Sequence, residues 1–482
     1  MTEFSVFNRY QPIINNWETF CDILSQPLPT CVWTNTLRVT PLQLADIFAE
    51  DGVAVEPLPW LDGGFKLQEG FRPGRHWAYL VGLYQIQEEV SMLPVLLLDP
   101  QPGDRILDMC AAPGNKTAQI SVKMDNKGTV AANDLSYGRM RAARQTLERL
   151  GLVNVSTAIC NGTNYPKAAG LFDKVLVDGP CSCEGTSRKE PSILKRIGPD
   201  VSKKKSGLQR ALLRKAVQLC KPGGKIVYST CTYAPEENEM VVDAILSEYG
   251  PDKLQLVPAH IPHFAASEGV TEWNGQTLHS SLRGAMRVWP HQNDTGGFFI
   301  AVLERVDQES TFDNDVDTQQ TAQTLFADTP IPADILPIIS ERFGIAPDVF
   351  SKYVLFKPGT RGAYLVNREN CPPTMPEPDA VGMLFMKTRV RYPKLSTAAS
   401  MLLGPNATRN LIELDLRQTH AYLNRQTIGV SAEQARHCTG KGYVLLKHRG
   451  FVLGVGVFWP DEDNQGGTVE SMFPKGWSPN GG

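Results

Sequence analysis

Two cysteines stand where neighbouring apolar segments of the chain end. Val177-Asp178-Gly179-Pro180-Cys181-Ser182 closes one segment, and Ser229-Thr230-Cys231-Thr232 closes the next. If both segments are parallel strands of one sheet, both thiols lie at its carboxyl edge, where such folds bind their ligands. A thiolate is a strong nucleophile, so this pair predicts covalent catalysis beside a bound ligand.

The reaction that fits such a thiolate is addition to an electron-poor ring carbon, such as carbon 6 of cytosine. Addition of Cys231 there makes carbon 5 nucleophilic enough to accept a methyl group, after which a base removes the carbon-5 proton and the thiolate leaves. Asp178 is placed to offset the negative charge that develops at the ring nitrogen. The Cys181-x-Cys183 pair lacks partners at zinc-ligand spacing, so we predict no metal. Six further cysteines are interpreted as small buried apolar residues: Cys21, Cys31, Cys160, Cys220, Cys371 and Cys438.

A loop of small residues follows an earlier apolar segment and opens a helix. It reads Cys110-Ala111-Ala112-Pro113-Gly114-Asn115-Lys116, and it matches neither the dinucleotide nor the triphosphate fingerprint. The next apolar segment ends at Asp134, whose carboxylate can bind both hydroxyls of a ribose, although Asp134 or Ser136 could instead cap the next helix. Together they predict an adenosine-bearing ligand without a phosphate cradle, which suits S-adenosylmethionine.

Alternating strands and helices must position these loops. Strands are expected at 105–109, 129–132, 155–159, 174–177 and 225–229, and helices at 116–124, 137–150, 207–219 and 236–249. This alternation predicts a parallel α/β sheet, completed by an antiparallel pair at 286–289 and 297–303. A helical stretch over 85–97 leads into this region.

The chain length suggests several units. We predict a small N-terminal α/β unit over 1–75, with a helix at Pro41–Glu50 behind Thr40, and the central sheet over 76–306. The segment 307–333 is polar and acidic and is predicted to be a linker. A small α/β unit over 334–379 and a β-rich unit over 380–482 follow, the latter with a hairpin at 442–447 and 451–458.

The net charge is −3, but one segment is strongly basic. From Thr186 to Lys225 twelve Lys and Arg oppose only Glu190 and Asp200, which gives 12 − 2 = +10. Such a segment is either a solvated helix face or a phosphate-binding patch. No apolar run is long enough to cross a membrane, and no secretory signal is recognised. The irregular spacing of ten cysteines indicates a reducing compartment, so a cytoplasmic location is expected.

These motifs resemble those of a known family. The elements D-x-C-A-A-P-G-x-K-T at Asp108, D-x-P-C-S at Asp178 and S-T-C-T at Ser229 with Glu236–Glu239 resemble the RNA cytosine-5 methyltransferases of the nucleolar-protein and Sun type. The resemblance extends from about residue 30 to 305 and includes Gln87-Glu88, Ser91-Met92 and Gly296–Phe299. Length and the C-terminal extension are most similar to bacterial members that act on 16S ribosomal RNA, and 409–482 resembles their RNA-binding PUA domain.

The resemblance implies a class I, Rossmann-like fold with a small N-terminal RNA-binding α/β domain and a β-rich, PUA-like RNA-binding extension at the C-terminus. It implies that Cys231 is the nucleophile, that Cys181 helps to release product, and that Asp178 contacts both cofactor and cytosine. Residues expected to bind S-adenosylmethionine are Cys110, Ala111, Ala112, Pro113, Gly114, Asn115, Lys116, Asp134, Arg139, Asn161 and Asp178. Asn161 stands where the family usually has an aspartate near the adenine.

The expected partner is RNA, with ribosomal RNA favoured, free or in the small ribosomal subunit. Neither a membrane nor a metal is expected, and the chain is expected to be a monomer. Under this interpretation the basic segment holds the phosphates beside a cytosine that has left its stack. Two alternatives stay open: a transfer RNA cytosine-5 methyltransferase, and a non-catalytic RNA-binding factor in ribosome assembly.

Overall fold

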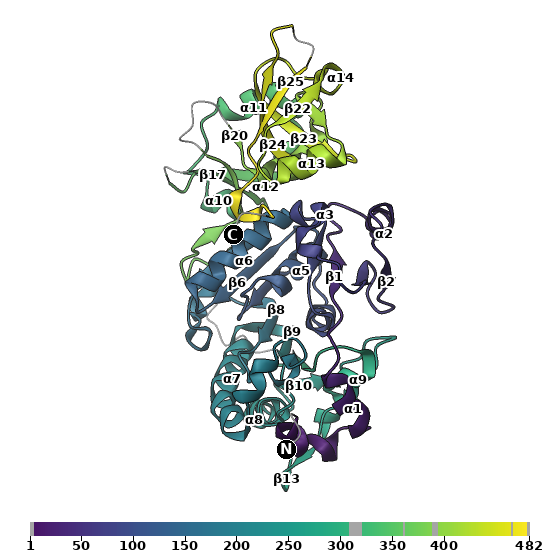
Figure 1. The fold of residues 1–482 in the computed structure, drawn as a ribbon. Helices are drawn as coiled ribbons and strands as arrows, with labels where there is room; N and C mark the ends of the chain where they lie inside the picture. Colours follow the sequence, from purple (N-terminus) through teal and green to yellow (C-terminus); the bar gives the residue numbers. More distant parts are fainter. Residues whose placement is uncertain (1–3, 308–320, 360–361, 388–393, 464–465, 480–482) are drawn as a thin grey trace.

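The computed structural model describes residues 4–307, 321–359, 362–387, 394–463 and 466–479. The C-terminal units lie at one end of the molecule and the N-terminus lies at the other, with the large central sheet between them (Figure 1). No helix in the described ranges has both the length and the apolar character needed to span a membrane.

The central sheet has ten strands and carries the predicted parallel core. Its path is β11-β14-β15-β9-β8-β5-β6-β7-β18, and β10 pairs with β15. The five strands from β9 to β7 are parallel, and β14 and β15 form the predicted antiparallel pair. The bounds are β5 Arg105–Asp108, β6 Thr129–Asp134, β7 Val155–Ile159, β8 Phe172–Asp178, β9 Cys220–Thr230, β10 Leu254–Val257, β11 Ser267–Glu268, β14 Met286–Val288, β15 Phe298–Arg305 and β18 Ala380–Val381.

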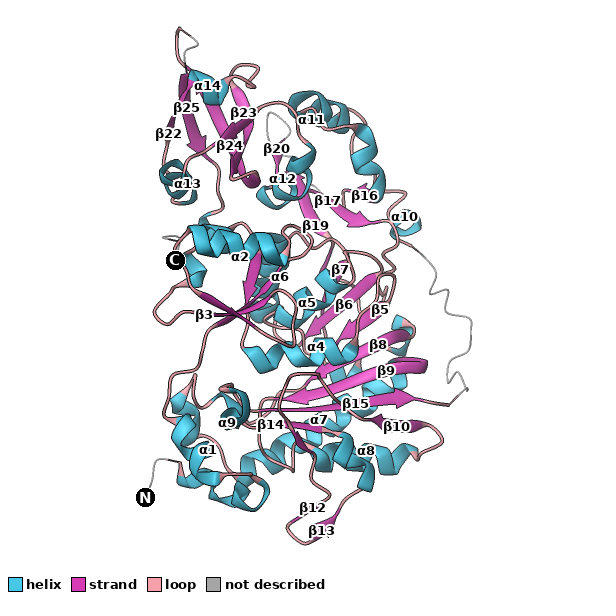
Figure 2. Ribbon diagram, turned by 90° about the vertical axis from the view of Figure 1, so that its right-hand side faces the viewer, coloured by secondary structure: helices cyan, strands magenta, loops and turns pink. Residues whose placement is uncertain are grey.

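Helices cover both faces of this sheet (Figure 2). Alternate strand residues point to opposite faces, so Ile106 packs against one layer of helices and Leu107 against the other. One layer contains α4 Leu93–Leu98, α5 Asn115–Lys123 and α6 Tyr137–Leu150, and the other contains α7 Pro199–Leu219 and α8 Glu239–Tyr249. Helix α7 was predicted for 207–219 but begins earlier, at Pro199. Proline is favoured in the first turn of a helix, so it suits this start.

The strand order reverses between β5 and β8. From β5 the chain proceeds to β6 and β7 on one side and then returns to place β8 and β9 on the other side. A crevice forms at such a reversal, outside the carboxyl ends of the strands. Asp178, a predicted site residue, ends β8, and Asp108 ends β5, so two carboxyl groups lie at this position.

The N-terminal region has two parts, a four-stranded sheet and a helical segment that packs elsewhere. A four-stranded sheet, β2-β3-β1-β4, comprises β1 Cys31–Thr34, β2 Val55–Pro57, β3 Gly64–Leu67 and β4 Tyr84–Ile86, with α2 Pro41–Glu50 capped by Thr40 as predicted. The sheet continues past the predicted boundary at residue 75. The helix predicted over 85–97 is wrong at its start, because Gln85 and Ile86 pair with β1 and helix α4 begins only at Leu93.

The described residues from Phe4 to Leu24 contribute to a different hydrophobic core from that sheet. Phe7, Tyr10 and Phe20, from the 3-10 helix Ser5–Ile13 and α1 Trp17–Leu24, pack with Tyr233 and Trp289 near the end of β9. The short α9 Pro290–Asn293 and the β12–β13 hairpin (Glu272–Trp273 and Gln276–Thr277) lie in the same part of the molecule (Figure 2).

Two sheets form the C-terminal units. One has the order β16-β17-β19-β20 and the other β21-β23-β24-β25-β22. Their bounds are β16 Tyr353–Phe356, β17 Gly362–Asn367, β19 Met383–Lys387, β20 Lys394–Leu395, β21 Leu411–Glu413, β22 Ile428–Ser431, β23 Gly442–His448, β24 Phe451–Pro460 and β25 Gly466–Ser471. The predicted boundary at 379 falls inside the first of these sheets, and β23 and β24 form the predicted hairpin.

The helices of the C-terminal units are α11 Ile335–Phe343, α12 Thr397–Leu403, α13 Leu416–Leu423 and α14 Ala432–Ala435. Within the predicted linker, residues 308–320 lie outside the described part of the chain, and Ala322–Leu325 forms the short helix α10. The C-terminal five-stranded sheet packs against the N-terminal four-stranded unit, in a core shared by Trp77, Leu80, Val444 and Leu446.

Candidate active site

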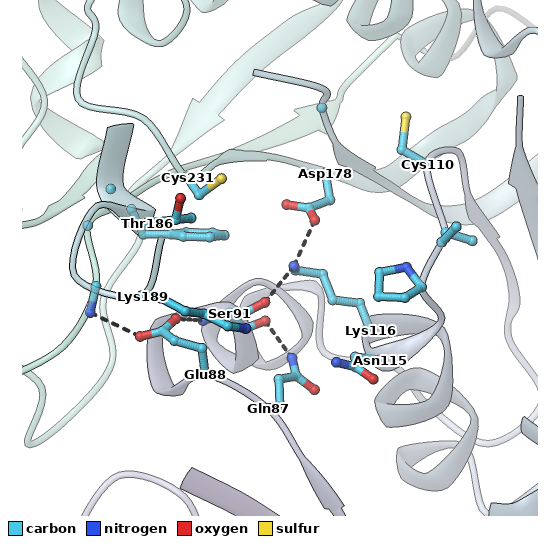
Figure 3. A pocket seen from close by; sticks show the side chains of 18 of the residues that line it. Gln87, Glu88, Ser91, Cys110, Asn115, Lys116, Asp178, Thr186, Lys189 and Cys231 are labelled. Atoms are coloured by element: carbon cyan, nitrogen blue, oxygen red, sulfur yellow. Dashed lines mark hydrogen bonds and ion pairs between the residues drawn. The ribbon is translucent and has the colours of Figure 1, made fainter. Parts of the chain in front are cut away.

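A cavity of about 300 Å³ opens where β5, β8 and β9 end. It brings together the loop after β5 and both Asp178 and Cys231, which are more than fifty residues away from that loop in the sequence (Figure 3). Of the residues predicted to act on a substrate or cofactor, the cavity is lined by Cys110, Ala111, Ala112, Pro113, Asn115, Lys116, Arg139, Asp178 and Cys231.

Asp178 is held at both of its oxygens. The Lys116 ammonium donates to Oδ2 at 2.7 Å, and the Ser229 hydroxyl donates to Oδ1 at 2.7 Å. Lys116 also donates to the Ser91 hydroxyl at 2.8 Å, so it joins the cofactor loop to the wall formed before β5 (Figure 3). The carboxylate is therefore fixed in direction before any ligand arrives.

Three sulfur atoms gather at the adjoining wall. The Sγ atoms of Cys181 and Cys231 lie 3.4 Å apart, and those of Cys181 and Cys183 lie 3.9 Å apart. Only Cys231 lines the cavity, and Cys181 is buried behind it. Of these three thiols, Cys231 is therefore the one that a molecule in the cavity can contact, and Cys181 lies directly behind it.

Each of the three thiols shifts the pKa of the other two. Hydrogen bonds with Cys181 and Cys231 lower the pKa of Cys183, and hydrogen bonds with Cys183 and Cys231 raise the pKa of Cys181. The hydrogen bond with Cys181 lowers the pKa of Cys231, but the bond with Cys183, burial and Asp178 outweigh it, so the net direction is upward. Cys183 is therefore the thiol of the three whose ionisation is most favoured.

Buried polar side chains orient both cysteine loops from behind. Glu237 accepts the backbone N–H of Ser182 at 2.9 Å, directly after Cys181. Asn238 accepts from the Thr230 hydroxyl at 2.6 Å and donates to the Thr232 carbonyl at 2.9 Å, on either side of Cys231. Because both side chains are fully buried, these bonds hold the two sulfurs at a defined separation.

The N-terminal segment supports the same wall. The Tyr10 hydroxyl donates to Glu184 at 2.8 Å, and the Thr232 hydroxyl donates to the same carboxylate at 3.0 Å. Burial raises the pKa of Glu184 to about 7. Sequence reasoning assigned no role to Tyr10 or Glu184, because nothing in their spacing indicates that they meet.

A buried ion pair closes this side of the site. The Arg287 guanidinium contacts the Glu239 carboxylate at 2.5 Å and donates to the Tyr233 carbonyl at 2.9 Å. Both partners are almost completely removed from solvent. The pair connects β14 to the start of α8 beside the Cys231 loop.

Loss of Arg287 is expected to destabilise the fold strongly. Arg287→Ala leaves the Glu239 carboxylate buried without its partner, which costs about 3–5 kcal/mol of unfolding free energy. Chemical denaturation of the two proteins measures the difference. Arg283→Ala is the matched control: its exposed pair with Glu268, at 3.6 Å, is expected to contribute less than about 1 kcal/mol. Equal losses in the two variants would contradict this prediction.

The remaining predicted cofactor residues lie around the cavity rather than on its surface. Asp134 is buried and accepts the Ala112 N–H at 3.2 Å, so it fixes the loop, and Arg139 lies 3.7 Å from its carboxylate. Gly114 has a φ of +99°, and a Cβ there would lie 3.0 Å from the Cβ of Ala143 in α6. Asn161 is exposed and caps the turn at Thr163.

Asp108 adds an unanticipated acidic group to the cavity. Its Oδ2 accepts the Thr117 hydroxyl at 2.7 Å, while its Oδ1 is buried without a well-formed hydrogen bond to any described residue. Burial raises the pKa of this carboxyl to about 7. Asp108 lines the cavity, and a buried carboxyl group there fits a ligand that carries a positive charge or an N–H donor.

Three family models match successive parts of the chain. Residues 6–89 match the N-terminal domain of 16S rRNA methyltransferase RsmF, residues 95–304 match 16S rRNA methyltransferase RsmB/F, and residues 409–478 match the PUA domain of methyltransferase RsmF. A crystal structure of a methyltransferase homologue from Pyrococcus horikoshii is 35% identical, with a TM-score of 0.54, and the match covers 60% of this chain and 90% of that one.

The chain belongs to the RsmB/F family.

Curated relatives are similar over a shorter share of their length. A mouse 28S rRNA (cytosine-C(5))-methyltransferase is 35% identical over 66% of this chain and 39% of its own length. The ribosomal RNA small subunit methyltransferase F of Escherichia coli K12 is 34% identical over 61% of this chain and 60% of its own length. The match thus spans less than two thirds of these relatives.

The fold distributes the basic segment of this RsmB/F chain, Thr186 to Lys225, between the two edges of the central sheet. The segment leaves the carboxyl edge of the sheet after β8, passes along α7, and enters β9 at the opposite edge. Arg188 is buried and structural, since it donates to Thr295 and pairs with Asp294. Arg214 pairs with Glu248 and Lys221 with Asp173. The exposed basic residues between β8 and the first turns of α7 are Lys189, Lys195, Arg196, Lys203 and Lys204, of which Lys189 lines the cavity.

Removing charge at the start of α7 tests the prediction that the basic segment binds RNA phosphates. Lys203 and Lys204 are exposed and have no acidic partner within the described residues, so their charges are available to phosphates. Lys203→Ala with Lys204→Ala should lower affinity and reduce the slope of log K against log salt by about 1 per lost phosphate contact. A salt series of binding curves measures the slope.

The matched control for this variant is Lys221→Ala. The Lys221 ammonium already pairs with Asp173 at 2.6 Å at the far edge of the sheet, so its loss should leave the salt slope unchanged. If the control and the double variant change the slope equally, the start of α7 is not the phosphate-binding part of the segment.

Several cavity residues received no role from sequence reasoning. Gln87, Glu88, Ser91 and Phe298 all line the cavity, and Glu88 accepts the Gly296 N–H at 3.0 Å. Most belong to short motifs that resemble those of the family, so a signal was present. What the sequence lacked was the direction in which each side chain points.

Proposed function

We propose that this RsmB/F protein transfers the methyl group of S-adenosylmethionine to carbon 5 of a cytosine in RNA, through a covalent bond between Cys231 and carbon 6. The observation that supports this most is the shared cavity. Cys231, Asp178 and the loop after β5 line one space, so a nucleophile, an acidic group and a donor site meet there.

The residues present fit the cofactor. Small side chains at Ala111 and Ala112 leave room for close approach of a ligand, and the buried Asp108 Oδ1 can accept from its ammonium group. Asp134 would hold the ribose from behind the loop, with Arg139 beside it, and Asn161 would lie toward the adenine. When bound, S-adenosylmethionine supplies an electrophilic methyl group.

Each step of the proposed reaction is assigned to different side chains of the cavity wall. Cys231 adds to carbon 6, which transfers electron density to carbon 5. The Lys116–Asp178 pair, joined at 2.7 Å, faces the ring and offsets the negative charge that develops on it. Cys181, 3.4 Å from the attacking sulfur, serves proton transfer as the adduct breaks down and Cys231 leaves. Glu237 and Asn238 keep both sulfurs in place.

Ribosomal RNA is the proposed substrate, and the 16S molecule of the small subunit is the favoured one. The names of the matching family models and of the Escherichia coli relative support this choice. We further propose that the C-terminal five-stranded unit, which matches a PUA domain, binds the same RNA, and that the protein acts as a monomer in the cytoplasm.

Bisulfite sequencing of total RNA from cells with and without the gene tests the proposal. One cytosine in small-subunit ribosomal RNA should lose its methylation signal in the deletion strain. The wild-type gene should restore the signal, and a Cys231→Ala gene should not. Loss of signal in transfer RNA alone would favour the transfer RNA alternative, and no change at any cytosine would favour a non-catalytic assembly factor.

A further inference from the structure

Cys183 is the third thiol of a cluster in which the proposed reaction uses only Cys181 and Cys231. The Sγ atoms of Cys181, Cys183 and Cys231 all lie within 4.8 Å of one another. Cys183 adopts a left-handed backbone conformation, with a φ of +63°, which non-glycine residues rarely adopt. That conformation turns a third sulfur toward the two catalytic ones.

The separations match those of a metal site. Zinc binds thiolates at about 2.3 Å. A cation at that distance from three sulfurs in one plane holds them about 4.0 Å apart, and a tetrahedral arrangement holds them slightly closer. The observed distances are 3.4 Å and 3.9 Å for the two pairs that include Cys181. A cation therefore fits among these sulfurs with only small side-chain movements.

The surrounding charges favour a thiolate site. Three thiolates around a divalent cation carry a net charge of −1, from −3 + 2. Lys205 and Arg196 interact with Cys183 electrostatically and oppose this charge. Asp178 acts in the opposite sense on Cys231, but its own charge is paired with Lys116. Soft sulfur ligands select thiophilic cations such as Zn²⁺, Cd²⁺ and Cu⁺ over Mg²⁺ or Ca²⁺.

We propose that Cys181, Cys183 and Cys231 form a binding site for a thiophilic cation, with Zn²⁺ as the physiological candidate and the fourth position open toward the cavity. Binding releases the thiol protons and engages the Cys231 sulfur. The cation and the target cytosine then exclude each other, so the metal is a reversible inhibitor. The binding site stands independently of the proposed function, and only the inhibition rests on it.

The spacing of the cysteines in the sequence did not indicate this site. Cys181 and Cys183 are two residues apart, and the third ligand comes from the end of the neighbouring strand β9. Parallel pairing of β8 with β9, which places Asp178 opposite Ser229, brings the two loops together. Sequence patterns that recognise zinc sites depend on local spacing and cannot detect such a pairing.

Titration of the reduced, full-length protein with Cd²⁺ tests the binding site. Sulfur-to-cadmium charge-transfer absorption should rise to one equivalent per protein. Cys183→Gly removes the sulfur and suits the left-handed backbone, so it should keep the fold, and Cys183→Ser is the second variant. Both should weaken binding by more than the roughly 10- to 100-fold that loss of an outer-sphere partner costs. Cys438→Ser, in the C-terminal unit, is the matched control and should bind like wild type.

Absence of a one-equivalent charge-transfer band in the wild type overturns the site, and so does equal Cd²⁺ affinity in the wild type and both Cys183 variants. A second measurement addresses inhibition. Zn²⁺ should stop methyl transfer by the wild type and a chelator should restore it, whereas the Cys183→Gly enzyme should need a higher Zn²⁺ concentration for the same fractional inhibition. A wild type that transfers no methyl group at any Zn²⁺ concentration would count against the proposed function, while the Cd²⁺ titration still decides the site.

Discussion

Cys231→Ala is expected to abolish methylation of RNA while leaving the binding of S-adenosylmethionine nearly unchanged. Without the sulfur no adduct forms at carbon 6, and carbon 5 of cytosine stays too weak a nucleophile to take the methyl group. Losing the nucleophile of a covalent catalyst lowers turnover by about four orders of magnitude or more. The Lys116–Asp178 pair and the loop after β5 are untouched by this change, so the donor site keeps its shape.

Transfer of a labelled methyl group to RNA and calorimetric titration with the cofactor measure the two effects separately. Cys160→Ala is the matched control, because Cys160 is also half-buried but lies outside the cavity. Its activity should equal that of the wild type. A Cys231→Ala enzyme that methylates RNA at the normal rate would falsify the assignment of the nucleophile.

Cys181→Ala is expected to trap the protein on its RNA. The Cys181 sulfur is 3.4 Å from that of Cys231 and serves the step in which the adduct breaks down. Removing a group that transfers protons in such a step slows it about 10²- to 10⁴-fold. Formation of the adduct continues, so a covalent protein–RNA complex should accumulate and survive denaturation.

Denaturing gel electrophoresis of the variant with labelled RNA and S-adenosylmethionine detects this complex as a slowly migrating band. Cys181→Ala combined with Cys231→Ala is the control, and it should form no such band because the bond to the RNA cannot form. If the single variant forms no complex while the wild type is active, Cys181 has no part in releasing the product.

Much of the fold was accessible from local patterns. Helix α6 occupies the predicted Tyr137–Leu150, because a serine cap, an amphipathic repeat and a closing glycine act within one stretch of chain. Strand β7 likewise has its predicted bounds. The five parallel strands were found because buried strands are short apolar runs between helices.

Elements whose partners are distant in sequence were less accessible. Gln85 and Ile86 were predicted to be helical, but they pair with β1 about fifty residues earlier, and that hydrogen bonding outweighs local preference. The packing of Tyr10 against Glu184 also has no local signal. Such contacts depend on where the sheet places its loops, which short-range periodicity does not contain.

The sequence by itself determined the chemistry available to this protein: a small-residue loop, an acid and two thiols, each at the end of an apolar strand. Residue type and position along a strand are local properties, so they could be read directly. Only the tertiary structure decided which of these groups meet. The reversal of strand order between β5 and β8 joins the loop to Asp178, and the pairing of β8 with β9 sets Cys183 beside Cys231. Those distances depend on pairing between strands far apart in the chain, which no local pattern encodes.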